Sequence, residues 1–357
     1  MKKGNLYVPL TLFLPIQIVL VKLISYFPGF VEHYYSNGIY PFISLFFRTI
    51  YGWVPFSIGD VLYMLIILSL FIFGYRFINN KSKNRKQQLY LLGAVFSVFY
   101  LLFHFFWGMN YHRNSLFKTL QLEQKEYSIE ELTKLTDILL LRLKQTQIQL
   151  VENDTIIVKI PYSKTEILKK TKFGYKALSK EYPQYVYRAP SIKKSLFSVP
   201  LTYMGFSGYF NPFSSEAQVD VLVPKVSLPM VCSHEVAHQL GLASESETNF
   251  IGFLAATRNK DDYFKYSGYL TALRYSIGSI SYRDSLLAKK YIKMIPKGAL
   301  KNIEESRNFW KSYQNKAEPF FKLFYDNYLK VNQQKEGIRS YNKMVNLLVA
   351  YNEKHGL

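Results

Sequence analysis

Cysteine is nearly absent from this sequence. Cys232 is the single cysteine in 357 residues, so no disulfide can form within the chain. Any part of the chain that is exported must therefore be stabilised by its hydrophobic core and by any metal that it binds. Cys232 lies two residues before His234, a spacing that turns it to another face of a helix. We interpret it as a packing residue and not as a metal ligand.

Charged residues are rare in three long stretches near the N-terminus, which contain only Lys22 and Arg76, each near the end of its stretch. Residues 6–27, 61–78 and 89–109 are apolar runs, each close to the roughly 20 residues that an α-helix needs to cross a bilayer. No small-x-small cleavage site follows the first run, so we interpret it as an uncleaved anchor and not as a signal peptide. The sequence thus predicts a membrane domain, residues 1–110, with three transmembrane helices in a lipid bilayer.

The basic residues around these runs predict an orientation. Those before the first run and between the second and third are Lys2, Lys3, Lys81, Lys83, Arg85 and Lys86. Arg48 is the only lysine or arginine in residues 28–60. The many aromatic rings of this segment suit a position along the membrane surface. Because basic loops stay in the cytoplasm, we predict a cytoplasmic N-terminus in a bacterial inner membrane. Residues 111–357 would then lie in the periplasm or outside the cell.

Acidic residues are scarce over the whole chain. Twenty-five Asp and Glu stand against 45 Lys and Arg, which gives a net charge of +20 at pH 7. Beside a membrane, a basic surface favours anionic lipid head groups or acidic envelope polymers as partners. A solvated basic surface without any partner fits the composition equally well. Nucleic acid is not expected as a partner on the non-cytoplasmic side.

The sequence His234-Glu235-Val236-Ala237-His238 is the strongest chemical signal in the chain. On a helix the two histidines, four residues apart, project from one face and can bind the same Zn²⁺. Glu235 between them is suited to act as the general base that activates water. Start and stop signals, a Pro at 229 and a Gly at 241, predict a helix over residues 229–240. The alternative is a surface helix that matches the pattern by coincidence.

A catalytic zinc needs a third protein ligand and an open position. The next predicted helix starts near Ser244 and offers Glu245 and Glu247. Ser244 and Glu247 fit the S-x-x-E capping box, which would occupy Glu247 at the helix start. We therefore favour Glu245 as the ligand and keep Glu247 as the alternative. Asn249 shares a face with Glu245 and could orient a metal ligand.

These motifs resemble those of a known enzyme class. HExxH followed by Glu245-Ser246-Glu247-Thr248-Asn249 is similar to the gluzincin branch of zinc metallopeptidases, although the gap after His238 is shorter than in thermolysin-like enzymes. His238 to Ser244 also mimics the metzincin motif, with Ser244 in place of its third histidine. The whole chain resembles an uncharacterised bacterial membrane-protein family placed among the zincins. The resemblance implies a predominantly helical α+β zincin-like (thermolysin-like) metallopeptidase domain over residues 111–357.

The remaining pattern predicts a small sheet within a helical domain. Residues 201–212 and 216–223 are predicted strands joined by a turn, and 155–160 is a third. Zincin domains place an edge strand beside the active helix, where an extended peptide can pair with it. The alternative is an ordinary hairpin whose Glu216 and Asp220 face solvent. Helices are predicted over residues 128–149, 163–180, 261–278, 281–294, 298–315, 317–332 and 337–354.

The predicted function is a membrane-anchored zinc metallopeptidase that hydrolyses peptide or other amide bonds. Its metal ligands would be His234, His238 and Glu245, with Glu235 as the catalytic base. Metallopeptidases also use a side chain to stabilise the oxyanion, and the candidates by residue type are Tyr203, Tyr209 and Tyr341. The competing hypothesis is an inactive, metal-binding scaffold that docks cell-envelope partners through its basic surface.

Overall fold

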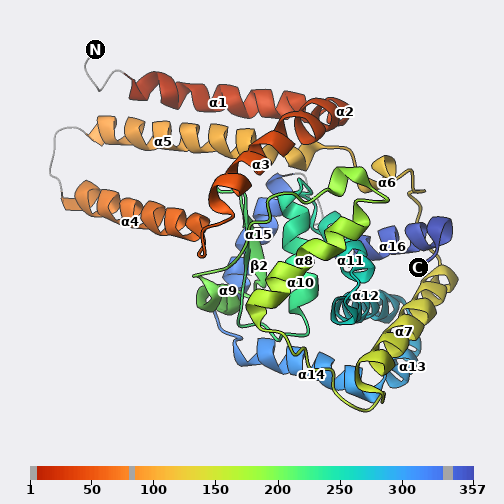
Figure 1. The fold of residues 1–357 in the computed structure, drawn as a ribbon. Coiled ribbons are helices and arrows are strands. Elements are labelled where there is room, and N and C mark those ends of the chain that lie inside the picture. Colours follow the sequence, from red (N-terminus) through yellow and green to blue (C-terminus); the bar gives the residue numbers. More distant parts are fainter. Residues whose placement is uncertain (1–5, 80–84, 333–340) are drawn as a thin grey trace.

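The computed structural model describes residues 6–79, 85–332 and 341–357 (Figure 1). The chain is mostly helical, and three helices stand apart from the rest by their apolar composition. Of the basic residues that predicted the orientation, Lys2, Lys3, Lys81 and Lys83 lie outside the described residues.

The three apolar runs form three long helices: α1 (Tyr7–Ile24), α4 (Ile58–Asn79) and α5 (Arg85–Phe106). Each is long and apolar enough to cross a membrane, so the three predicted runs are helices with the length and composition of membrane spans. They extend from one side of the molecule, with α1 and α5 side by side (Figure 1). Where α1 and α5 pack together, the buried amide of Gln17 donates to Ser97 Oγ over 2.9 Å. A second polar contact joins the same helices, because Thr11 Oγ1 donates to Tyr90 O over 2.8 Å. The two contacts fix the register of the helices in a largely apolar interface.

The aromatic segment between the first two spans is also helical. It forms α2 (Pro28–Phe30), a π-helical stretch over Val31–Ile39 and α3 (Tyr40–Tyr51). Its outer rings, such as Phe42 and Trp53, are exposed as expected for a membrane surface. Its inner face differs from that simple picture, because Tyr40 and Ser44 are buried against the helix that carries the histidines. The segment therefore connects the membrane helices to the rest of the fold.

The described sheet has three short strands, β1 (Ile192–Lys194), β2 (Gly208–Asn211) and β3 (Glu216–Val219), in the order β1-β3-β2. β3 is parallel to β1 and antiparallel to β2, and Ala217 faces both Ile192 and Phe210. The predicted strand over 201–212 is wrong in its first half. Residues 198–204 form the helix α9 (Ser198–Met204), which ends at Gly205 with φ +81°.

The predicted strand over residues 155–160 is also wrong. Residues 155 and 156 lie in a turn and a bend, and residues 157–160 belong to no strand of the described sheet. The side-chain amide of Asn302 takes the place of a neighbouring strand: its Nδ2 donates to Val158 O over 3.1 Å, and its Oδ1 accepts from Val158 N over 3.3 Å. A strand pattern in the sequence cannot distinguish a main-chain partner from a side-chain amide of this kind.

Glu216 and Asp220 are fully buried, so the solvent-facing alternative for them is wrong. Glu216 accepts hydrogen bonds from the main-chain N–H groups of Ile58 and Gly59, over 3.3 and 2.6 Å. These groups open α4, where a carboxylate also interacts favourably with the helix dipole. Asp220 accepts from Thr202 Oγ1 over 2.6 Å. Burial raises the pKa of both carboxyls.

The helices that follow agree closely with their predicted positions. Both capping boxes, Ser128 with Glu131 and Ser163 with Glu166, are formed. The longer helices of this part are α7 (Ile129–Val151), α8 (Lys164–Leu178), α10 (Leu228–Gln239), α11 (Glu245–Arg258), α12 (Asp262–Arg283), α13 (Ser285–Met294), α14 (Lys297–Ser312), α15 (Glu318–Val331) and α16 (Tyr341–His355). Helix α11 lies in the middle of the core, in contact with α8, α10, α12 and α16. These contacts fix the first turn of α11 in position beside α10.

Candidate metal centre

Helices α10 and α11 approach each other closely at Gly252. A Cβ atom placed on Gly252 would lie 3.0 Å from His234 N and 3.1 Å from its Cα. Because glycine has no side chain, the backbone of α11 can lie directly against the turn of α10 that carries the first histidine. This contact brings the first turn of α11 over the two histidines.

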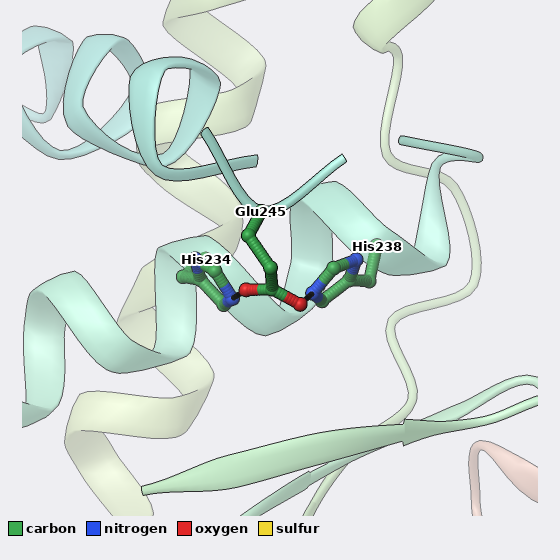
Figure 2. A group of neighbouring side chains, drawn as sticks. All are labelled: His234, His238 and Glu245. Atoms are coloured by element: carbon green, nitrogen blue, oxygen red, sulfur yellow. Dashed lines mark ion pairs between the residues drawn. The ribbon is translucent and has the colours of Figure 1, made fainter. Parts of the chain in front are cut away.

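Three side chains meet at this point, and we call them the metal group: His234, His238 and Glu245. The Glu245 carboxylate lies between the two imidazoles (Figure 2), with Oε2 at 3.3 Å from His234 Nε2 and Oε1 at 3.4 Å from His238 Nε2. One potential ligand atom from each residue lies within 4.8 Å of the others. The metal group could therefore hold a metal ion.

Hydrogen bonds to the far side of each ring orient the two imidazoles. His234 Nδ1 is 3.0 Å from Asn249 Oδ1, and His238 Nδ1 is 2.7 Å from Leu242 O. Both partners are acceptors, so each Nδ1 carries a hydrogen and each Nε2 faces Glu245. There Nε2 can donate to the carboxylate when the ring is protonated, or offer its lone pair to a metal ion when the ring is neutral. Metal-binding histidines have this arrangement. The donor set is compatible with a metal ion such as zinc. Asn249 contacts one of the predicted metal ligands, as its predicted orienting role requires.

Charge in this buried group is stabilised by its own members. Burial favours the protonated form of Glu245, but the two imidazoles outweigh this effect and hold its pKa well below the usual range. Burial likewise lowers the pKa of His238, but Glu245 beside it raises the net value to about 9. A carboxylate that stays negative in a buried position is the environment in which a cation is bound favourably.

Glu235 is buried next to the metal group and lies against strand β2. Its Oε2 has no hydrogen-bond partner among the described residues, which is uncommon for a buried carboxylate oxygen. A Cβ atom on Gly208 would lie 2.6 Å from Glu235 Oε1, so only a glycine leaves room for this carboxylate beside the strand. Burial is the main cause that raises the pKa of Glu235, to about 7. The arrangement leaves Oε2 without a partner in the wall of the cavity that Glu235 lines.

Glu247, the alternative ligand, points away from the histidines. Its Oε1 accepts a hydrogen bond from the main-chain N–H of Leu116 over 2.7 Å. The predicted capping box is wrong, because the Ser244 side chain makes no cap hydrogen bond at the start of α11. Helix geometry explains the difference between the two acids, since residues two apart point about 200° away from each other. The structure therefore brings Glu245, and not Glu247, to the imidazoles.

Tyr325 contributes to the site and was missed by the sequence analysis. It lies on α15, and its hydroxyl donates to Glu245 Oε1 over 2.6 Å. Among the tyrosines considered from the sequence, Tyr209 lines the same cavity but hydrogen-bonds to Asp60, while Tyr203 is half-exposed. The side chain of Tyr341 lies outside the described part of the chain. No local pattern distinguishes Tyr325 from the other tyrosines, of which the chain has 30 in all.

The C-terminal end of α10 is held by side chains that come from the membrane side. Trp107 Nε1, just after α5, donates to His238 O over 3.3 Å. Tyr40 and Ser44 both donate to Gln239 O, over 2.9 and 3.0 Å. These carbonyls are among the last four of the helix and have no partner within it. The membrane-side segments thus complete the helix that carries both histidines.

An ion pair extends this connection into the turn after α10. Arg113 pairs with Glu32 over 2.6 Å, and both side chains are nearly buried. The same guanidinium donates to the main-chain oxygen of Gly241 over 2.9 Å. Gly241 has φ +90°, as the predicted helix stop requires. The turn between the second histidine and Glu245 is therefore fixed by a residue that follows the third span.

A single cavity of about 910 Å³ joins the metal group to the membrane helices. Its polar end is formed by the metal group, Glu235 and Tyr325, with Gly208 to Phe210 of β2 beside them. Its other end is lined by side chains of α1 and α5. The volume lies in the range of small-molecule binding sites, roughly 300–1,000 Å³.

Comparison with known proteins identifies a family. A family model described as a protein of unknown function, DUF3810, matches residues 35–349, which is most of the chain. The matched region includes the second and third apolar helices and all residues of the metal group. No curated protein and no solved structure matches the sequence.

Proposed function

The chain belongs to the DUF3810 family, and we propose that it is a membrane-anchored zinc metallopeptidase that hydrolyses peptide or other amide bonds. The observation that carries the proposal is the convergence of His234, His238 and Glu245 within 4.8 Å, next to a buried Glu235 with a free carboxylate oxygen. Two imidazoles and one carboxylate form a ligand set that leaves a fourth position open on zinc, as in catalytic sites. Its cofactor is therefore Zn²⁺.

Each residue of the site has a role in amide hydrolysis. When bound, zinc would polarise the substrate carbonyl and lower the pKa of water towards neutrality. Glu235 takes a proton from the attacking water and delivers it to the leaving nitrogen. The carbon–nitrogen bond breaks, the hydroxyl stays on the carbon and the amine leaves with the proton. Tyr325 Oη donates its hydrogen to Glu245 Oε1 and so orients this ligand.

Strand β2 supports a peptide as the substrate. It stands at the end of the β1-β3-β2 order, so within the described residues one of its edges has no strand partner. Its residues Gly208, Tyr209 and Phe210 line the cavity beside Glu235. An extended peptide can pair with such an edge through main-chain hydrogen bonds. The scissile bond would then lie over the metal group.

The test compares the full-length, zinc-loaded protein with its Glu235→Gln variant. Substrates are quenched fluorescent peptides of mixed sequence, and zinc is measured by elemental analysis. We expect cleavage to fall by at least about 100-fold in Glu235→Gln, because the base is lost, while the zinc content is unchanged. Glu247→Gln is the matched control, since it makes the same change in a partly buried carboxyl, in the first turn of α11, that faces away from the site. It should retain both properties.

Two other outcomes would contradict the proposal. Zinc bound without cleavage of any peptide, in the parent protein and in Glu235→Gln alike, would favour a metal-binding scaffold that docks envelope partners through its basic surface. Equal cleavage by the parent protein and Glu235→Gln would show that the activity does not come from this site.

We also propose that the site faces the periplasm or the cell exterior from a bacterial inner membrane, with the N-terminus in the cytoplasm. The basic residues between the second and third spans, Arg85 among them, support this orientation. The +20 charge of the chain supports contact with anionic lipid head groups or acidic envelope polymers. A reporter fused after Leu357 should be active only outside the cytoplasm. A fusion active in the cytoplasm would reverse the orientation.

A further inference from the structure

The cavity at the metal group does not stop at the surface of the soluble part. It continues along the membrane helices, where Leu14 and Ile18 of α1 and Phe96 and Phe99 of α5 line it. Phe96 lies ten residues before the end of α5, and Leu14 lies ten residues before the end of α1. Ten helical residues correspond to about 15 Å. The cavity therefore extends about halfway through a hydrocarbon core that is roughly 30 Å thick.

The membrane end of the cavity is apolar and open at the side. Ile18, Phe96 and Phe99 are 47%, 58% and 41% exposed, although all three line the cavity. Exposed apolar side chains on these helices face lipid, so a hydrocarbon chain could enter from the bilayer without passing through water. Polar groups lie at the opposite end, where Lys22, His112 and the metal group are found.

From this geometry we propose that the substrate is a peptide or amide that carries a long acyl chain, and that the chain lies in the apolar end of the cavity, against side chains of both α1 and α5, while the scissile bond lies at the metal group. The proposal rests on the proposed hydrolase function and names its substrate class. The apolar end of the cavity, about 15 Å long, matches the length of an acyl chain in one leaflet, which is half of a hydrocarbon core roughly 30 Å thick. A transmembrane helix is about 10–12 Å wide and would span the whole membrane, so it does not fit a cavity of about 910 Å³.

The first test measures cleavage as a function of acyl chain length. Full-length, zinc-loaded protein in lipid nanodiscs is given one quenched peptide in acetylated, octanoylated and palmitoylated forms. We expect kcat/KM to rise by about tenfold or more from the acetyl to the palmitoyl form, because each buried methylene adds to binding. The measured quantity is kcat/KM for the palmitoyl form divided by kcat/KM for the acetyl form. A ratio near one in the parent protein would overturn the proposal.

A pair of variants separates the cavity from simple partitioning into the bilayer. Ile18→Trp fills the cavity, so the palmitoyl-to-acetyl ratio should fall towards one. Ile16→Trp makes the same change on the same helix at a similarly exposed isoleucine, 53% against 47%, that does not line the cavity. It should leave the ratio unchanged. If both variants keep the high ratio, the bilayer and not the cavity selects the acyl chain.

Binding without cleavage provides an independent test. A palmitoyl peptide with a photoreactive diazirine in its chain is added to zinc-loaded Glu235→Gln, and the labelled residues are found by mass spectrometry. We expect labelling near Ile18 and Phe99 that excess palmitoyl peptide removes and acetyl peptide does not. Uniform labelling of all lipid-facing surfaces would overturn the proposal. So would labelling of the same residues by a diazirine phospholipid, if palmitoyl peptide cannot displace that phospholipid.

The two readouts keep the two proposals distinct. If the parent protein cleaves the acetylated peptide but shows no chain-length effect, the hydrolase function stands and the acyl-chain site is wrong. If no peptide is cleaved but the labelling is specific, the acyl-chain site stands and the hydrolase function is wrong.

Discussion

The first turn of α11 has two faces, and each carries one glutamate: Glu245 is buried and Glu247 is partly buried. On the metal face, Glu245 lies 3.3 and 3.4 Å from the two imidazoles and accepts a hydrogen bond from Tyr325. On the opposite face, Glu247 accepts from the N–H of Leu116 in the segment that follows the third span. Two residues of the same type, two positions apart, thus serve different purposes. One could bind a metal, and the other fastens the helix to the membrane-side part of the fold.

The two faces depend on each other through α10 and the turn after it. Arg113, close in sequence to Leu116, holds Gly241 and pairs with Glu32 before the second span. Tyr40, Ser44 and Trp107 hold the carbonyls at the end of α10. The position of the metal group is therefore set partly by residues from the membrane side. This explains how one cavity can be shared by the metal group and the membrane helices.

The largest expected effect would test the difference between the two faces directly. Glu245→Ala removes one of three metal ligands, so zinc affinity should fall by more than the roughly 10- to 100-fold typical of residues that only orient a ligand. Glu247→Ala should change zinc affinity by no more than about twofold. It should instead lower the free energy of unfolding by about 1–3 kcal/mol, because the N–H of Leu116 loses its partner. Chelator competition measures the affinity, and chemical unfolding in detergent measures the stability.

The opposite order of effects on zinc binding would contradict the roles given to the two glutamates. If Glu247→Ala released zinc and Glu245→Ala retained it, α11 would have to present its other face to the histidines. Equal losses in both variants would indicate that the whole turn unfolds. Unfolding data on the same samples distinguish these two cases.

A smaller effect is expected from the hydrogen bonds that hold the end of α10 on the membrane side. Tyr40→Phe removes one of the two hydroxyls that donate to Gln239 O, and Ser44 keeps the other. We expect the free energy of unfolding to fall by only about 0.5–1.5 kcal/mol, the usual contribution of one hydrogen bond. Tyr34→Phe is the matched control, because Tyr34 lies in the same segment but is exposed. A loss as large for Tyr34→Phe would show that the hydroxyl of Tyr40 does not hold α10.

Local signals in the sequence were reliable where the structure depends on neighbouring residues. The capping boxes at Ser128 and Ser163 are formed, and α10 begins and ends within one residue of the predicted limits. Both rest on hydrogen bonds and backbone preferences within a few residues. The third capping box, at Ser244, is not formed, because a main-chain N–H more than a hundred residues earlier in the chain takes Glu247 instead.

The errors arose where a distant segment supplied the partner. Residues 155–160 were predicted as a strand, but Asn302 bonds both main-chain groups of Val158 and Gln147 Nε2 donates to Ile156 O. The hairpin alternative predicted that Glu216 is a surface charge, but Glu216 is buried at the N-terminus of α4. Tyr325 could not be chosen at all, because it meets Glu245 from a position 80 residues later.

The sequence alone determined the three membrane helices, because apolar length is a property of one segment. It also determined that His234 and His238 share a helix face, because a spacing of four residues fixes this. The tertiary structure decided which glutamate joins them, which tyrosine contacts that glutamate and that the cavity reaches between the membrane helices. The physical reason is that each of these features depends on contacts between segments far apart in the chain, which only packing brings together.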